Sequence, residues 1–286
     1  MPMNAEYIVG AGAVLSEGPV WWQGTLLWVD IERRRIHRWS PASESHQHWE
    51  FPHRLGFVIP STRGDAVVGA DATLARVDLG SGRLTPWTRP AGEPDDHRFN
   101  DAKCDPSGRL WAGTLALSEA PELGTLYVIG SDGVPMPRVP KVTISNGLAW
   151  SPEGDTLYFI DSATRRVDAF DFDGASASIS NRRTVIRVED GLPDGMAIDH
   201  AGNLWVALWG GWKVACHDPR TGSRLAEVPL PVEAVTSCCF AEGDALWITT
   251  ASRDLDAAGR AAQPLAGGVF RAHVGIGGPP VIPFAG

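Results

Sequence analysis

The sequence predicts an all-β protein, a six-bladed β-propeller with four antiparallel strands in each blade. The 286 residues include 32 Gly and 22 Pro, and both residue types destabilise the interior of a helix. A short unit, a Gly-centred turn followed by an apolar or aromatic strand, recurs six times at spacings of 40 to 48 residues. A repeat of this length that contains four short strands is typical of a propeller blade.

The six units follow one another along nearly the whole chain. They begin with the segments 22–28, 62–68, 105–111, 151–158, 199–205 and 241–247. The fifth unit illustrates the remainder, because strands at 205–209, 212–216 and 224–230 are separated by turns rich in Gly and Asp. Such alternating segments, bounded by turn residues, indicate antiparallel hairpins.

The first strand, at 7–14, precedes the first unit and has no blade of its own. We expect it to pair into the last blade, which ends near residue 272, because ring closure satisfies edge strands that would otherwise be exposed. The whole chain, 1–286, is therefore expected to form a single propeller domain.

Composition excludes several classes of function. The net charge of −9 is spread along the chain, whereas nucleic-acid binding requires a basic patch. No segment approaches the roughly 20 apolar residues of a membrane span, and residues 1–14 lack the features of a signal peptide. The four cysteines show no C-x-x-C spacing, which favours buried free thiols and a cytoplasmic location.

Three oxygen-bearing side chains are expected to meet at one mouth of the central channel. Glu17, Asn146 and Asp194 stand just before the Gly-centred turns of units one, four and five, where the innermost strand of each blade begins. Two buried carboxylates repel each other unless a cation lies between them. These ligands suit Ca²⁺, Mg²⁺ or Mn²⁺, and Zn²⁺ is possible. The alternative is that each residue only caps a local turn.

At these residues the sequence resembles the senescence-marker-protein/gluconolactonase/luciferin-regenerating-enzyme family. The matching segments, within residues 15 to about 272, include L-S-E-G-P-V-W (15–21), R-F-N-D-A-K-C-D-P-S-G-R-L-W-A-G-T (98–114), I-S-N-G-L-A-W-S (144–151) and L-P-D-G-M-A-I-D (192–199). The resemblance implies a six-bladed propeller that hydrolyses sugar lactones with one divalent metal. It implies metal ligands at Glu17, Asn146 and Asp194, and substrate contacts at Arg98 and Asn100.

The expected function is therefore the metal-dependent hydrolysis of a sugar lactone, gluconolactone or a pentonolactone, to the aldonic acid. The metal would polarise the lactone carbonyl and Asp194 would act as general base. The expected partner is the small lactone alone, with the protein a monomer or weak homodimer. One branch of the family has paired glutamates in the loop after A-G-T, where this chain has Ser118, and this difference bears on the choice of sugar.

Two other functions remain open: a non-catalytic, calcium-binding regulatory protein, and a related metal-dependent esterase or phosphotriesterase. Three further features have structural interpretations that we favour. His46-x-His48 is expected on a solvated edge strand rather than at a metal, and Cys238-Cys239 in core packing, although alternation turns one thiol toward the channel. His97 is expected in a solvent-facing loop rather than at the substrate.

Overall fold

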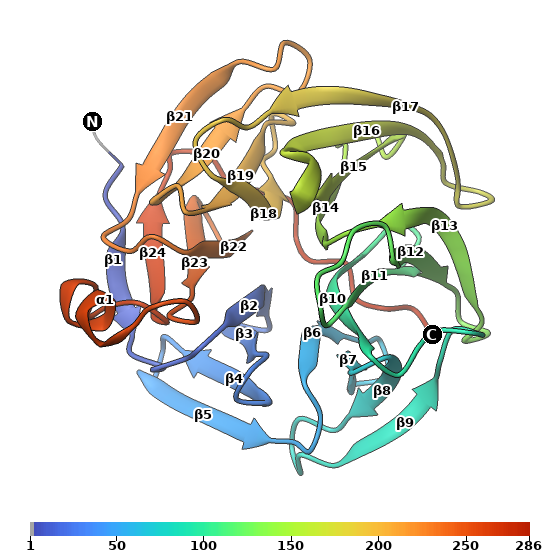
Figure 1. The fold of residues 1–286 in the computed structure, drawn as a ribbon, viewed down its shortest axis with the longest axis horizontal. Coiled ribbons are helices and arrows are strands. Elements are labelled where there is room, and N and C mark those ends of the chain that lie inside the picture. Colours follow the sequence, from blue (N-terminus) through green and yellow to red (C-terminus); the bar gives the residue numbers. More distant parts are fainter. Residues whose placement is uncertain (1–2) are drawn as a thin grey trace.

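A computed structural model describes residues 3–286, which form six four-stranded antiparallel sheets arranged as a ring (Figure 1). Blade 1 contains β2 (Ser16–Trp22), β3 (Thr25–Asp30), β4 (Arg35–Ser40) and β5 (Ser45–Glu50). Blade 2 contains β6 (Leu55–Pro60), β7 (Ala66–Ala70), β8 (Thr73–Val77) and β9 (Leu84–Thr88). Blade 3 contains β10 (His97–Cys104), β11 (Leu110–Ala116), β12 (Gly124–Ile129) and β13 (Pro135–Val142). Blade 4 contains β14 (Ser145–Trp150), β15 (Thr156–Asp161), β16 (Arg166–Asp173) and β17 (Ser178–Arg187). Blade 5 contains β18 (Leu192–Ile198), β19 (Leu204–Trp209), β20 (Lys213–His217) and β21 (Arg224–Pro229). The predicted propeller is confirmed.

Blade 6 is completed by the N-terminus, as predicted. Its sheet order is β22 (Val235–Phe240), β23 (Ala245–Thr250), β24 (Val269–His273) and β1 (Glu6–Val9). The strand β1 is shorter than the predicted 7–14, since it ends before the Gly10-Ala-Gly12 segment, where Gly12 has a left-handed φ of 56°. The two ends of the ring are thereby joined in one sheet.

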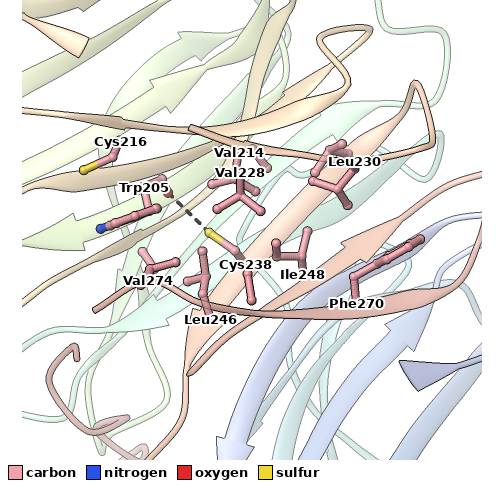
Figure 2. Close-up of a cluster of buried hydrophobic side chains, with 14 of the residues drawn as sticks. Trp205, Val214, Cys216, Val228, Leu230, Cys238, Leu246, Ile248, Phe270 and Val274 are labelled. Atoms are coloured by element: carbon pink, nitrogen blue, oxygen red, sulfur yellow. Dashed lines mark hydrogen bonds between the residues drawn. The ribbon is translucent and has the colours of Figure 1, made fainter. Parts of the chain in front are cut away.

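The core lies between neighbouring blades. Trp28, Trp111, Trp205 and Trp247 are all buried. Figure 2 shows Trp205 of blade 5 packed with Cys238, Leu246 and Ile248 of blade 6. The Cys238 thiol donates to the Trp205 carbonyl over 3.3 Å. The expected core packing of this thiol is confirmed, and all four cysteines are buried and free of disulfides.

Few helices interrupt the strands. Within residues 3–286 they are the single turn η1 (Ser162–Thr164), between β15 and β16, and α1 (Ala257–Ala262), between β23 and β24. Among these residues no helix has the length and apolar character needed to cross a membrane.

The C-terminal tail, residues 274–286, crosses the face of the ring at which the innermost strands end. Phe284 is fully buried and exchanges backbone hydrogen bonds with Pro60 and Thr62 of blade 2, each 2.9 Å long. Ala285 donates to Gly108 of blade 3 over 2.9 Å. Residues 279–282 cover a mostly apolar cavity of about 130 Å³ at this end of the channel. The tail thus links blade 6 to blades 2 and 3.

A histidine cluster lies on the outer part of blade 1. His46 and His48 are exposed on the edge strand β5, as predicted. His37 on β4 is 1% exposed, stacks on Trp28 and has its Nδ1 atom 2.9 Å from Nε2 of His46. Burial, followed by the charges of His46 and His48, lowers the pKa of His37 to about 3.

We expect His37 to weaken the fold in mild acid. The unfolded chain gains a proton at His37 below pH 6.5, whereas the folded protein does not until about pH 3. The free energy of unfolding therefore falls as pH falls through this window, by roughly 2 kcal/mol between pH 6.5 and 5. Urea unfolding of wild type and His37→Gln across this range measures the effect. The variant should show a shallower pH dependence, and parallel curves would contradict the assignment.

Candidate metal and substrate site

Five predicted residues line one pocket at the mouth where the innermost strands begin. Glu17, Arg98, Asn100, Asn146 and Asp194 come from β2, β10, β14 and β18, the innermost strands of blades 1, 3, 4 and 5. Figure 1 shows these strands converging on the centre of the ring. The pocket has a volume of about 350 Å³, within the usual range for small-molecule sites.

The innermost strands are irregular next to the pocket residues. The strand register shifts at the same place in each of the four blades, between Glu17 and Val20, Phe99 and Ala102, Ser145 and Leu148, and Pro193 and Met196. Such bulges re-aim side chains. The candidate ligands therefore lie within strands rather than in hairpin turns, although the Gly18 amide donates a local hydrogen bond to the Glu17 carboxylate over 3.0 Å.

The glycine after Asn146 lets two inner strands approach closely. A Cβ at Gly147 would lie 2.8 Å from the backbone oxygen of Asp194. This contact is too close for any side chain, so the Asn-Gly pair reflects strand packing at the channel. It brings Asn146 and Asp194 to the same place from two blades.

A continuous chain of hydrogen bonds holds the amide side chains in position. Arg98 Nη1 donates to Asn100 Oδ1 over 2.5 Å, and Asn100 Nδ2 donates to Asn146 Oδ1 over 2.8 Å. Asn146 Nδ2 donates in turn to Ser162 Oγ over 2.8 Å, and that hydroxyl donates to the Pro193 carbonyl over 2.6 Å. Blades 3, 4 and 5 are connected at the site by this chain.

The two carboxyl groups are buried with like charges around them. Glu17 and Asp194 are each 6% exposed. Burial, followed by the charge of Asp101, raises the pKa of Glu17 to about 8. The pKa of Asp194 is raised well above its usual value by burial and then by Glu17 and Asp101. Without a counter-charge, the site therefore favours protonated carboxyls.

A divalent cation fits this set of donors. Asp194 Oδ1 is buried and has no hydrogen-bond partner among residues 3–286. Two carboxylates and an amide oxygen are the hard ligands that Ca²⁺ and Mg²⁺ prefer. Among the described residues no three His, Cys, Asp or Glu side chains gather as a potential metal cluster, so the amide of Asn146 is essential to the proposed set.

The structure corrects the prediction for His97. This residue opens β10, is 4% exposed and has Nδ1 2.8 Å from Glu93 Oε1. The hydroxyl of Tyr127 donates to the other Glu93 oxygen over 2.6 Å. The preceding Asp95 and Asp96 suggested a solvated loop, but the imidazole turns into a buried hydrogen-bonded cluster and does not line the pocket.

The rim of the pocket contains residues that sequence reasoning missed. Ser118 is exposed and lies outside the pocket lining, whereas the next residue, Glu119, lines it. An acid is thus present at the mouth one position later than expected. Arg253 and Asp254 line the opposite side; they stand outside the inner strands, so the blade repeat gives no signal for them.

Comparison with known proteins places this geometry in a family. Residues 15–252 match the region described as "SMP-30/Gluconolactonase/LRE-like region". The chain belongs to the SMP-30/gluconolactonase/LRE family. The resemblance found in the sequence is thereby confirmed, and the matched region contains all five pocket residues.

Three similar proteins illustrate the range of this family. Regucalcin of Gallus gallus is 39% identical over 284 residues, covering 95% of both chains. The protein of Bacillus subtilis (strain 168) named "Putative sugar lactone lactonase YvrE" is 35% identical over 290 residues, covering 99% of both chains. A crystal structure from Agrobacterium tumefaciens strain C58, described as a calcium-binding protein, regucalcin, superposes with a TM-score of 0.93 at 25% identity, covering 99% of this chain and 98% of that chain.

Proposed function

We propose that this protein hydrolyses a sugar lactone, gluconolactone or a pentonolactone, to the aldonic acid with the help of one divalent cation. The observation that carries the proposal is the burial of Glu17 and Asp194 beside Asn146 in a pocket that also contains Arg98. Membership of a family with members named for lactone hydrolysis supports the reaction class.

Glu17, Asn146 and Asp194 would hold the cation. A cation bound there supplies Lewis acidity toward the lactone carbonyl and lowers the pKa of water. Because Asn146 is neutral, the three ligands carry two negative charges, which match one divalent ion. Asn100 fixes the orientation of Asn146 through the 2.8 Å hydrogen bond to its side-chain oxygen.

The remaining steps fall to the protein side chains. Asp194 accepts a proton from the attacking water as general base, through the carboxylate oxygen that does not bind the cation. General base catalysis typically contributes about 10²–10⁴-fold. The planar guanidinium of Arg98 donates to the oxygens of the lactone and to the carboxylate that forms when the ring opens.

The polar floor of the pocket, which includes Arg98 and Asn100, favours a hydroxylated lactone over an apolar ester or a phosphotriester. Arg98 is buried with its Nη1 atom bound to Asn100 and to the Phe99 carbonyl, which leaves the rest of the fork for a substrate. The apolar residues of the wall, Leu15, Leu115, Ile144 and Leu192, surround this floor. A ring with an apolar face and several hydroxyl groups suits this combination.

A regulatory calcium-binding role is the second candidate, because an Agrobacterium relative is described as calcium-binding. Both functions would use the same ligands. They differ in what happens after the cation binds, since a purely regulatory protein has no need of the Arg98 guanidinium beside the cation ligands.

The proposal is tested by titrating acid release from gluconolactone and pentonolactones at constant pH. Wild-type protein stripped with a chelator should lose activity, and Ca²⁺, Zn²⁺, Mg²⁺ and Mn²⁺ should be compared for its recovery. Spontaneous hydrolysis without protein is the control. Cation binding without acid release from any lactone would contradict the enzyme and favour the regulatory role.

A further inference from the structure

An ion pair connects opposite sides of the ring above the pocket. Arg253 Nη2 lies 3.0 Å from Glu119 Oε1. Glu119 belongs to the connection between β11 and β12 in blade 3, and Arg253 to the connection between β23 and α1 in blade 6. Blades 3 and 6 lie on opposite sides of the ring (Figure 1), and both residues line the pocket. The pair therefore spans the mouth.

The backbone on each side of this pair is anchored. Ser252 donates from its backbone nitrogen to Val14 over 3.0 Å and from its hydroxyl to Ala13 over 2.8 Å. The amide of Glu119 donates to Ala116 over 2.8 Å. The two side chains, in contrast, are 37% and 40% exposed. These partly exposed side chains can separate by changes of rotamer.

The charges in the pocket indicate what the pair can contact. Arg98 is buried at the base of the pocket that Arg253 and Glu119 also line. A lactone whose carbonyl faces a cation held by Glu17, Asn146 and Asp194 would direct the hydroxyls at the other end of the molecule toward the rim. An arginine has five donors and a glutamate has two acceptor oxygens, so together they match a group of hydroxyls.

We propose that Arg253 is a specificity residue, which leaves its ion pair with Glu119 when the sugar enters and donates hydrogen bonds to the hydroxyls remote from the lactone carbonyl. This inference rests on the proposed lactonase function. A partly exposed ion pair contributes only about 0–1 kcal/mol, so the pair separates readily when substrate enters. Replacement of this ion pair by hydrogen bonds to substrate hydroxyls favours hydroxylated lactones over unsubstituted ones.

The test compares Arg253→Ala with wild type on gluconolactone and on δ-valerolactone, which has the same ring without hydroxyls. Hydrogen bonds from a charged donor are worth about 1.5–3 kcal/mol, so kcat/KM for gluconolactone should fall roughly 10- to 100-fold, mainly through KM. The value for δ-valerolactone should change less than about threefold. Arg253→Lys, which keeps the charge but loses the planar fork, should recover part of the loss.

Binding provides a second readout that needs no turnover. Calorimetric titration with gluconate and with 5-hydroxyvalerate should show that Arg253→Ala weakens only the first. The matched control is Arg220→Ala, since Arg220 has an 84% exposed side chain and lies in the β20–β21 turn on the opposite face. This variant should match wild type throughout.

The outcomes separate this inference from the proposed function. Equal effects of Arg253→Ala on both lactones and both acids, or no effect on either, would overturn the role of Arg253 while leaving the lactonase intact. Wild-type protein that hydrolyses no lactone with any cation would overturn the proposed function, and the inference would fall with it.

Discussion

Asp194→Asn is expected to lower kcat/KM for sugar lactones by at least roughly a thousand-fold. The substitution keeps the shape of the side chain, but it removes one of the two charges proposed to hold the cation, together with the proposed general base. Loss of a general base alone accounts for about 10²–10⁴-fold. Steady-state kinetics at increasing calcium concentration measure the effect.

Saturating calcium separates the two roles of Asp194. If the residue were a cation ligand only, high calcium would restore kcat; we expect kcat to stay low even at saturation. Asp101→Asn is the comparison variant, because Asp101 is a neighbouring carboxyl that faces the cavity at the other end of the channel; its removal takes away a charge that raises the pKa of Asp194 but leaves the proposed base in place. It should keep most of the activity. Normal turnover by Asp194→Asn would remove Asp194 from the mechanism.

The metal-free protein is expected to lose stability as pH rises. The pKa of Glu17 is raised from 4.5 to about 8, so between these values the folded state holds a proton that the unfolded chain has released. This contribution is fully present below pH 4.5 and is lost as pH rises through about 8. Its size is on the order of 5 kcal/mol for Glu17, with a shift of the same sign at Asp194.

Calcium should remove this dependence, because the cation takes the place of the proton. Urea unfolding at pH 5.5 and 8.5, with chelator and with calcium, measures both effects. Stabilisation by calcium should be much larger at pH 8.5. Glu17→Gln has no proton to release, so its metal-free curve should be flatter than that of wild type. An identical calcium effect at the two pH values would contradict a cation site formed by these carboxyls.

The repeat explains how much of this structure the sequence predicts. Each blade uses the same turn and the same innermost strand, so the positions of Glu17, Asn146 and Asp194 within their units place them at one mouth of the ring. The closing strand could be predicted for a related reason: it is a strand without a blade. Family resemblance then assigned Arg98 and Asn100 to the pocket, where the structure places both.

Features outside the repeat could not be predicted in this way. The tail after residue 273 has no counterpart in other blades, and its contacts with Pro60 and Gly108 join segments far apart in the sequence. Arg253 stands in a connection longer than those of the other blades, and only the ring brings it to Glu119. The prediction for His97 was wrong because its acidic neighbours, Asp95 and Asp96, belong to the exposed loop before it. The orientation of the His97 imidazole is set instead by its buried partner Glu93.

The covering of the far end of the channel by residues 279–282 has a consequence for turnover. In the proposed reaction, an aldonate formed beside Asp194 would leave through the mouth by which the lactone enters, past Arg253 and Glu119. Product release and substrate entry would then share one mouth, so the next lactone could bind only after the aldonate has left.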